Sequence, residues 1–348
     1  MPKPHQRWPM EISFTSIKDK SVMINPHKGF APEEIPFEIR YDPLTGETGR
    51  VFDMPFQADK PDLDETIRRS QGIFCPFCPD NLEKSTGLFP KEMIAEGRVT
   101  VGESTLIPNL VPFDKYAGVS ILSHRHYIPM EDLTPQTMKD AFLSSLVFIR
   151  SVAGYDENVR CFNLNWNYLP PAGSSMIHPH LQPNCGEIPT NELRLQIEGS
   201  KWYFAETGRN FWHEYIEAEK RTGARYVAEI ENTCWLMSFV PLGFLPDVSV
   251  VFPDHFSLAA LEEEEIMPFL NGLSSVLTYF RHQNIFSFNV SIFSVREEDH
   301  FRMNGRICPR LFPRAIRNND MAYPQALHKE PFSVRPPEVV CRELKEFF

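Results

Sequence analysis

The sequence predicts an α+β fold made of two copies of one strand–strand–helix–strand unit, and three observations lead to this prediction. Val111 and His126 return as Val240 and His255, in both cases 129 positions later. In each half, strand-like runs are followed by one long amphipathic helical stretch. The 31 prolines and 28 phenylalanines are typical of short strands with proline-bounded turns and aromatic packing between layers. A repeat of this length fixes the architecture of both halves together.

The first part of the chain is predicted to differ from the repeated unit. Up to about Phe74 the sequence is rich in loops. One hairpin is predicted over residues 39–47, where Asp42, Pro43 and Gly46 favour a turn between extended flanks. We therefore treat this part as an N-terminal segment outside the two copies.

The repeated part contains three predicted helices. Amphipathic helices are expected over residues 135–152 and 261–281, and a more polar helix over 211–222. The strand that begins at Phe162 returns at Phe288, 126 positions later, so small loop deletions separate the two copies. The resulting division is a loop-rich N-terminal segment (1–74), a first half (75–200) and a second, degenerate half (201–348).

Composition restricts the partners of the protein. A formal net charge of −11 gives no broad basic surface for a nucleic-acid backbone, although a few arginines could hold a small phosphorylated ligand. The start of the chain lacks the basic and apolar blocks of a signal peptide. The longest apolar run, around residues 141–149, is far shorter than the roughly 20 residues that a bilayer span needs. We expect a soluble, cytoplasmic protein that binds neither nucleic acid nor membranes.

Two of the seven cysteines form the pair Cys75-Pro-Phe-Cys78. In a reducing compartment this spacing favours metal ligation, since no second pair and no thioredoxin-like context support a redox role. A closed zinc site needs four ligands. His126, at the end of a predicted strand, and His178 are the natural completions, with His124 as the alternative to His126.

The stretch GSSMIHPHLQ, residues 173–182, holds two histidines on either side of a proline. In an extended segment residues i and i+2 face the same side, so His178 and His180 present their rings to one surface. The offset of 126 aligns His-Pro-His with Asn304-Gly-Arg306, so the second half has lost both histidines. This asymmetry indicates a chemical role in the first half and a scaffold role in the second.

A histidine that stays free of metal can act as a nucleophile. A neutral imidazole attacks phosphorus and forms a labile phosphoramidate, so His180 could split one displacement into two steps. A backbone carbonyl of the adjoining segment would hold its other ring nitrogen as a donor. The N–H groups of Gly173 to Ser175, the Ser175 hydroxyl and the Gln182 amide could bind the phosphate oxygens.

These residues resemble a known family. The cysteine pair, a histidine at a strand end, and Asn167 followed by Gly173-Ser-Ser-x-x-His-Pro-His-x-Gln182 look like the galactose-1-phosphate uridylyltransferases of the histidine triad superfamily. The resemblance includes the RYDPLTG and NLVP stretches and covers most of the chain, from about residue 39 to 323. It implies a duplicated α+β unit with a mostly antiparallel sheet, helices packed on it, and a homodimer.

The resemblance also implies roles for single residues. His180 would be the catalytic nucleophile that becomes nucleotidylated, and the N-terminal segment would contribute to the nucleotide site. The partners would be a nucleotide-sugar and a sugar phosphate or phosphate, within carbohydrate metabolism such as that of galactose. Ser175 and Gln182 would bind phosphate with Gly173 beside them, and Asn167 and Asn109 would contact the nucleotide. The arginines expected after the PLTG turn are not cleanly matched, and Arg50 is the nearest candidate. One Zn²⁺ would be held by Cys75, Cys78, His126 and His178.

Departures from the family pattern bear mainly on the substrate. Asn304 and Arg306 stand on the strand where the galactose enzymes carry the histidines of a second metal site, which argues against a second metal. Pro324 follows Tyr323 where their sugar-contacting segment has a Tyr-Glu pair, and Leu181 replaces the usual glycine of the motif. The identity of the hexose is therefore open.

Three functions stay open after these departures. The first is transfer of a nucleoside monophosphate from a nucleotide-sugar to a phosphorylated acceptor. The second is phosphorolysis of a nucleotide-sugar or dinucleoside polyphosphate by inorganic phosphate. The third is nucleotide binding by a zinc-stabilised protein without turnover. Arg310 and Arg314 could reach a substrate phosphate or form surface ion pairs.

Overall fold

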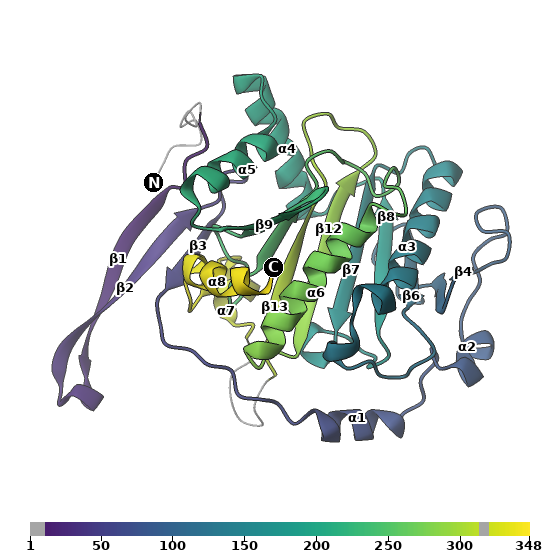
Figure 1. Ribbon diagram of the computed structural model, residues 1–348, viewed down its shortest axis with the longest axis horizontal. Helices are drawn as coiled ribbons and strands as arrows, with labels where there is room; N and C mark the ends of the chain where they lie inside the picture. The colour runs from purple at the N-terminus through teal and green to yellow at the C-terminus, as the bar shows by residue number, and fades with distance from the viewer. Residues whose placement is uncertain (1–10, 313–319) are drawn as a thin grey trace.

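The computed structural model describes residues 11–312 and 320–348, and its centre is one ten-stranded sheet. The strand order is β4-β5-β6-β8-β7-β12-β13-β11-β10-β9, so each half supplies five strands in the same arrangement, and the halves meet where β7 pairs with β12 (Figure 1). The strands of the first half are β4 (Val99–Val101), β5 (Ser104–Pro108), β6 (Tyr116–Ile121), β7 (Cys161–Tyr168) and β8 (His180–Gly186). Those of the second are β9 (Tyr226–Ile230), β10 (Thr233–Met237), β11 (Val248–Val251), β12 (Ser287–Val295) and β13 (Asn304–Arg310).

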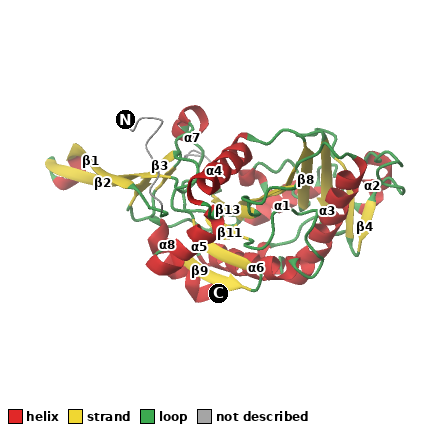
Figure 2. Ribbon diagram, turned by 90° about the horizontal axis from the view of Figure 1, so that it is seen from above, coloured by secondary structure: helices red, strands yellow, loops and turns green. Residues whose placement is uncertain are grey.

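Two long helices cover one face of this sheet, as the sequence predicted. They are α3 (Pro135–Tyr155) and α6 (Ile266–His282), and they pack against each other and the sheet (Figure 2). The Thr134 hydroxyl caps α3 by accepting from the Thr137 N–H. The main apolar core fills the space between helices and sheet, with side chains such as Trp166, Leu181 and Phe269 buried in it.

The predicted duplication is confirmed by the strand register. Asn165 of β7 pairs directly with Ser291 of β12, its equivalent 126 positions later, so the approximate two-fold axis passes between them. The Ser291 hydroxyl donates to Asn165 Oδ1 at 2.7 Å. The predicted fold class, an α+β protein with a mostly antiparallel sheet and helices packed on it, is confirmed.

The register corrects one detail of the predicted alignment. Gln182 pairs with Asn165, and Arg306 pairs with Ser291. Gln182 is therefore the structural equivalent of Arg306, and His180 that of Asn304. The sequence offset of 126 holds within β7 and β12 but shifts by two residues beyond the following loops. The second half still lacks both histidines.

The N-terminal segment holds more strand than predicted. Strands β1 (Ser16–Asn25) and β2 (Ala31–Tyr41) form a long hairpin that projects from the body (Figure 1). With β3 (Thr48–Phe52) and β14 (Phe332–Ser333) they make a four-stranded sheet. The predicted turn between β2 and β3 is confirmed: the Asp42 N–H donates to the Glu47 carbonyl at 2.8 Å, and Gly46 has a φ of 73°.

The remaining helices connect these sheets. Helix α5 agrees with the predicted polar helix, whereas α4 was not predicted and crosses the proposed boundary at residue 200. No helix within the described residues is long and apolar enough to cross a bilayer. The bounds are α1 (Leu63–Gln71), α2 (Pro79–Ser85), α4 (Asn191–Thr207), α5 (Phe211–Thr222), α7 (Tyr323–His328) and α8 (Pro337–Leu344).

Candidate active site and metal centre

His180 is the first residue of β8, a strand held between β6 and β7. Successive side chains of a strand point to opposite faces, so Leu181 enters the core under α3 while His180 and Gln182 lie on the other face. Asn165 pairs with Gln182, and Asn167 follows it on the same face of β7. The structure thus brings together three of the predicted site residues, His180, Gln182 and Asn167, on the face without the two long helices.

The ring of His180 is held in one orientation by the backbone of its own segment. Its Nδ1 lies 2.8 Å from the carbonyl oxygen of His178. A carbonyl can only accept, so Nδ1 carries the proton and Nε2 keeps its lone pair. Burial lowers the pKa of His180, although the hydrogen bond to the carbonyl opposes this shift. The residue therefore has the neutral, oriented imidazole that a nucleophile needs.

Four predicted ligands meet beside this histidine. The Sγ atoms of Cys75 and Cys78 and the Nδ1 atoms of His126 and His178 all lie within 4.8 Å of one another. Cys78 Sγ lies 3.3 Å from His126 Nδ1, and His178 Nδ1 lies 3.7 and 3.8 Å from the two sulfurs. Tetrahedral zinc with bonds of about 2.3 Å to sulfur and about 2.0 Å to nitrogen separates its ligands by roughly 3.6 Å. The cluster can therefore hold a metal ion of that kind.

The outer nitrogen of each histidine in the cluster also has a partner. His178 Nε2 lies 2.8 Å from the Ser123 carbonyl, and His126 Nε2 lies 3.2 Å from the Ser70 hydroxyl. Such contacts fix the ring and its tautomer and turn Nδ1 towards the cluster. The structure thus selects His126 over His124, which is exposed.

The charges of the cluster residues agree with metal binding. Burial lowers the pKa of His178 to about 4, so its ring is neutral at physiological pH and can ligate. Burial, followed by the neighbouring Cys75, raises the pKa of the Cys78 thiol to about 11, so this sulfur ionises readily only beside a cation. All seven cysteines are free thiols.

Phe77 is a site residue that the sequence reasoning missed. It stands between the two cysteines, and its ring centroid lies 5.1 Å from that of His180 in an edge-on arrangement. It packs against a small apolar cluster of Ile107, Val119 and Ile121, which belong to β5 and β6 on the His180 face of the sheet. The signal was present in the sequence, since any residue between two metal ligands is carried to the site with them.

The loop before His178 contains the predicted phosphate-binding residues. Gly173 has a φ of 86° and Ser175 is exposed, whereas Ser174 is buried and its hydroxyl donates to the Met176 carbonyl at 2.6 Å. Leu169 starts the loop with φ 68° and ψ 165°, a conformation rarely adopted by residues other than glycine. The loop is therefore a tightly bent turn with exposed groups at Gly173 and Ser175.

Other predicted residues lie further from His180. Asn109 follows β5, two strands from β8 in the sheet, and its side chain accepts from the Val111 N–H at 3.0 Å. Arg50 lies in β3 of the four-stranded sheet and forms an ion pair with Glu330. Within this chain Arg50 is not brought to the His180 group, and its phosphate-binding role stays a prediction.

The sequence leaves open whether Arg310 and Arg314 bind a substrate phosphate or form ion pairs. Arg310 forms a two-point ion pair with Asp320, at 2.7 and 2.8 Å. Arg314 lies outside the described residues. His255, the second-half counterpart of His126, pairs with Glu265 at 3.3 Å.

The second half uses the equivalent strand positions for internal contacts. The Asn304 amide donates to Gln196 at 2.9 Å, and Arg306 pairs with the buried Asp247 at 2.8 Å. A hollow of about 210 Å³ lies beside Arg306, lined mainly by polar side chains of both signs, including Glu47, Glu192 and Lys329.

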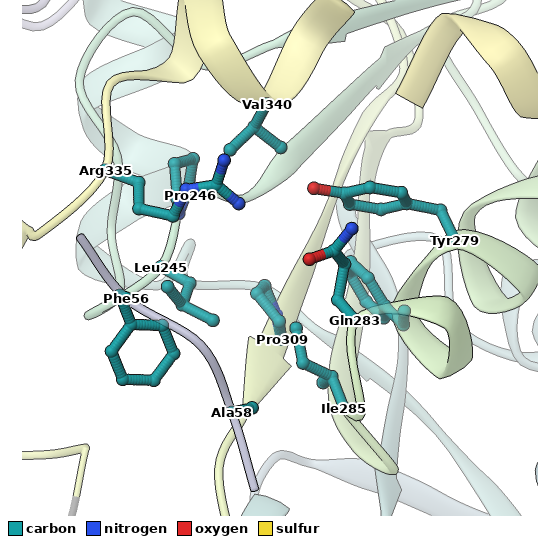
Figure 3. Close-up of a pocket in the computed structure, with 11 residues that line it drawn as sticks. Phe56, Ala58, Leu245, Pro246, Tyr279, Gln283, Ile285, Pro309, Arg335 and Val340 are labelled. Carbon is teal, nitrogen blue, oxygen red and sulfur yellow. The ribbon is translucent and has the colours of Figure 1, made fainter. Parts of the chain in front are cut away.

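A second hollow lies between the chain after β3 and the second half. It is lined by Phe56, Leu245 and Ile285, with Tyr279, Gln283 and Arg335 at one side (Figure 3). Its volume of about 20 Å³ has room for about one water molecule. The hollow lies where the N-terminal segment contacts the second half, and it is too small for a substrate.

Comparison with known proteins places this geometry in context. An uncharacterized protein of Archaeoglobus fulgidus is 32% identical over 319 residues, which cover 91% of this chain and 94% of the other. A galT-like protein from Arabidopsis thaliana superposes with a TM-score of 0.67 at 18% identity, over 88% of this chain and 98% of that one. An ADP-glucose phosphorylase from the same plant, with bound ADP-glucose, gives 0.68 at 17%, over 89% and 98%. A uridylyltransferase gives 0.62 at 17%, also over 89% and 98%. No family model matches the sequence.

Proposed function

Since the chain belongs to the same family as the Archaeoglobus fulgidus protein and has the fold of the galT-like proteins, we propose that it is a zinc-containing nucleotidyltransferase. It would move a nucleoside monophosphate from a nucleotide-sugar to a phosphorylated acceptor through a nucleotidyl-His180 intermediate. One observation carries the proposal: the His178 carbonyl holds Nδ1 of His180, while the His178 ring belongs to the metal cluster.

The proposed chemistry has two displacement steps. The Nε2 lone pair of His180 attacks the α-phosphorus of the donor, forming an N–P bond as the P–O bond to the sugar phosphate breaks. The sugar 1-phosphate leaves with the bonding electron pair. A phosphate oxygen of the acceptor then attacks the same phosphorus, and the N–P bond breaks and returns the electron pair to Nε2. The proton stays on Nδ1 throughout, and its hydrogen bond to the His178 carbonyl stabilises the positive charge of the modified ring.

The surroundings of His180 offer groups for both parts of a nucleotide. Exposed donors at Gly173 and Ser175, with the Gln182 amide on the same sheet face, would bind the phosphoryl oxygens. The half-buried ring of Phe77, which packs on the buried side chains of Ile107 and Val119, could stack against a nucleobase. Neutral donors and an apolar platform suit a nucleotide in a protein of net charge −11.

The metal would have a structural role in this scheme. Zinc held by the two cysteines, His126 and His178 would fix the cysteine loop, and with it Phe77, against the catalytic strand. The donor set of two thiolates and two imidazoles is that of closed zinc sites. His180 itself is not among the four ligands, so its Nε2 is left for the substrate.

Inorganic phosphate is the second candidate acceptor. The fold superposes as well on an ADP-glucose phosphorylase as on a galT-like protein. In addition, Tyr323 is exposed at the start of α7 and Pro324 follows it, so the Tyr-Glu pair of the galactose enzymes is missing at this position. The first displacement is the same for both acceptors, and only the second distinguishes them.

A homodimer is part of the proposal. The projecting hairpin of β1 and β2 exposes apolar side chains, among them Val22 at 63% and Phe30 at 71% exposure. Exposed apolar surface of this kind is common where proteins associate. Light scattering of the purified protein would measure the assembly, and a monomer at all concentrations would contradict this part.

Labelling of His180 tests the proposal directly. The protein is incubated with a panel of UDP- and ADP-sugars carrying a labelled α-phosphate, and acid-labile nucleotidyl-protein is trapped. We expect label on the wild type and on the control His124→Ala, and none on His180→Ala. Adding glucose 1-phosphate, galactose 1-phosphate or inorganic phosphate to the labelled protein then identifies the acceptor by release of the label. Label on His180→Ala would remove the nucleophile, and binding of nucleotide without label on the wild type would favour the non-catalytic alternative.

A further inference from the structure

Asn289 of the second half contacts two parts of the site in the first half. Its Nδ2 donates to Asn167 Oδ1 at 2.7 Å and to the Ala172 carbonyl, directly before Gly173, at 2.8 Å. Asn289 and Asn167 are paired residues of β12 and β7. One amide group of β12 thus contacts both Asn167, which is predicted to bind the nucleotide, and the loop that leads into Gly173–Ser175. Both contacts cross the seam between the halves, where β12 pairs with β7.

The orientation of this amide is fixed by Arg310. Arg310 Nη1 donates to Asn289 Oδ1 at 3.0 Å, and a guanidinium has only donors. The oxygen of Asn289 therefore faces Arg310, and its NH₂ group faces Asn167. Arg310 is itself held by Asp320, which also accepts from the Leu311 N–H at 2.9 Å.

The same reasoning extends to Asn167. Because its Oδ1 accepts from Asn289, its own NH₂ group is turned away from the seam. Asn167 is half-buried on the His180 face of the sheet. It therefore offers hydrogen-bond donors to a ligand, and it suits an acceptor such as a phosphoryl or sugar oxygen.

The contact with Ala172 acts on a strained loop. Leu169, at the start of this loop, has a φ of 68° and ψ of 165°, a strained conformation that persists only where the surroundings impose it. The hydrogen bond from Asn289 lies three residues further on and ties the loop to β12. Without it, the exposed groups at Gly173 and Ser175 lose one support of their position.

We propose that Asn289, oriented by Arg310, is a positioning residue through which the second half sets the donor face of Asn167 and the shape of the Gly173–Ser175 loop. This inference rests on the proposed function for its ligand, a nucleotide-sugar or nucleotide. It gives the degenerate half a role in binding although that half has lost the histidines.

Three variants test the inference. Asn289→Ala removes both donors, and Asn289→Asp replaces them with acceptors that force the Asn167 amide to turn over. Asn271→Ala changes an exposed asparagine of α6 and is the matched control. Thermal unfolding establishes that each variant is folded before its properties are compared.

The first readout is the dependence of His180 labelling on the concentration of the UDP- or ADP-sugar that labels the wild type. We expect both Asn289 variants to raise the half-saturating concentration about tenfold or more, with a change of less than about threefold in the maximal rate. A merely structural residue would lower the amount of active protein and leave the half-saturating concentration unchanged.

The second readout does not depend on catalysis. Backbone amide hydrogen exchange of residues 172–176 should be faster in Asn289→Ala than in the wild type or Asn271→Ala. If the wild type takes no label from any donor, the proposed function fails, and exchange together with the affinity for AMP and UMP still decides the positioning role. Unchanged exchange with unchanged half-saturation or nucleotide affinity would overturn the inference.

Discussion

The Nδ1 atom of His180 lies 2.8 Å from the carbonyl oxygen of His178, and this hydrogen bond joins the candidate metal cluster to the proposed nucleophile. His178 directs its ring to the cluster and its backbone carbonyl to the next histidine, because residues two apart in an extended segment share a side. Pro179 between them has no N–H and a fixed φ, which restricts the segment further. A short stretch of chain therefore carries both a candidate metal ligand and the proposed nucleophile.

Loss of one cluster thiolate should remove the metal and destabilise the protein. We expect Cys75→Ser to lower zinc from about one ion per chain to near zero and to reduce the melting temperature, since metal binding contributes to folding. Elemental analysis and thermal unfolding measure both effects. Cys308→Ser, at a thiol outside the cluster, is the control and should keep its zinc. Full zinc content in Cys75→Ser would remove Cys75 from the site.

Phe77 should contribute to the binding of the donor. We expect Phe77→Ala to lower kcat/KM for the labelling donor about tenfold, which corresponds to about 1.4 kcal/mol, because its ring contacts His180 and the apolar cluster. Phe74→Ala, at an exposed position three residues earlier, is the control and should behave like the wild type. Equal loss in the two variants would point to a general effect on the cysteine loop instead of a contact with the nucleotide.

Much of the fold was predictable because the two halves repeat. The offset from Phe162 to Phe288 placed the central strands correctly, and the helix over residues 135–152 was found almost to its end. The exposed strand β1 escaped prediction because none of its residues is fully buried, so no alternation of polar and apolar residues marks it. Helix α4 was missed for a related reason, since its weakly amphipathic sequence buries only four side chains.

The metal cluster was predictable from residue spacing, whereas the seam between the halves was not. Cys75, Cys78 and His178 belong to local motifs, and their spacing in the sequence is enough to predict metal binding. Asn289 contacts Asn167 and Ala172, which lie more than a hundred residues away in the sequence, and these contacts depend on the register of β7 against β12. Beyond the loops that follow β7 and β12 the offset falls from 126 to 124, so the sequence alignment of β8 with β13 was wrong by two residues.

The helix over the second half should tolerate no side chain at Gly272. A Cβ atom there would lie 2.2 Å from the ring of Trp235, which is fully buried. We expect Gly272→Ala to lower the free energy of unfolding by about 2 kcal/mol or more, because the ring has no space to move. Gly154→Ala is the control near the end of α3, where nothing lies within 4 Å, and it should raise stability by up to about 1 kcal/mol. Urea unfolding of both variants measures the difference, and similar values would contradict the close packing of α6.

Glu338 should make the stability of the protein depend on pH. It accepts from Arg40 of β2 at 2.9 and 3.0 Å and from Arg225 at 2.8 Å, so it ties the N-terminal sheet to the second half. Burial alone would raise the pKa of this carboxyl, but the hydrogen bonds from the two arginines outweigh it and lower the pKa below 4.5.

A carboxyl whose pKa is lowered in the folded protein stabilises the folded state at pH values above 4.5. This contribution is lost as the pH falls through the pKa of Glu338 in the folded protein. We expect Glu338→Gln to reduce the free energy of unfolding by about 3 kcal/mol at neutral pH, because two buried guanidinium groups lose their shared partner. The difference from the wild type should shrink as the pH is lowered below 4.5, and Glu346→Gln, at an exposed glutamate near the end of the chain, should show neither effect. Urea unfolding at a series of pH values decides the matter: a difference that stays constant down to the lowest pH would mean that Glu338 acts through packing and not through its charge.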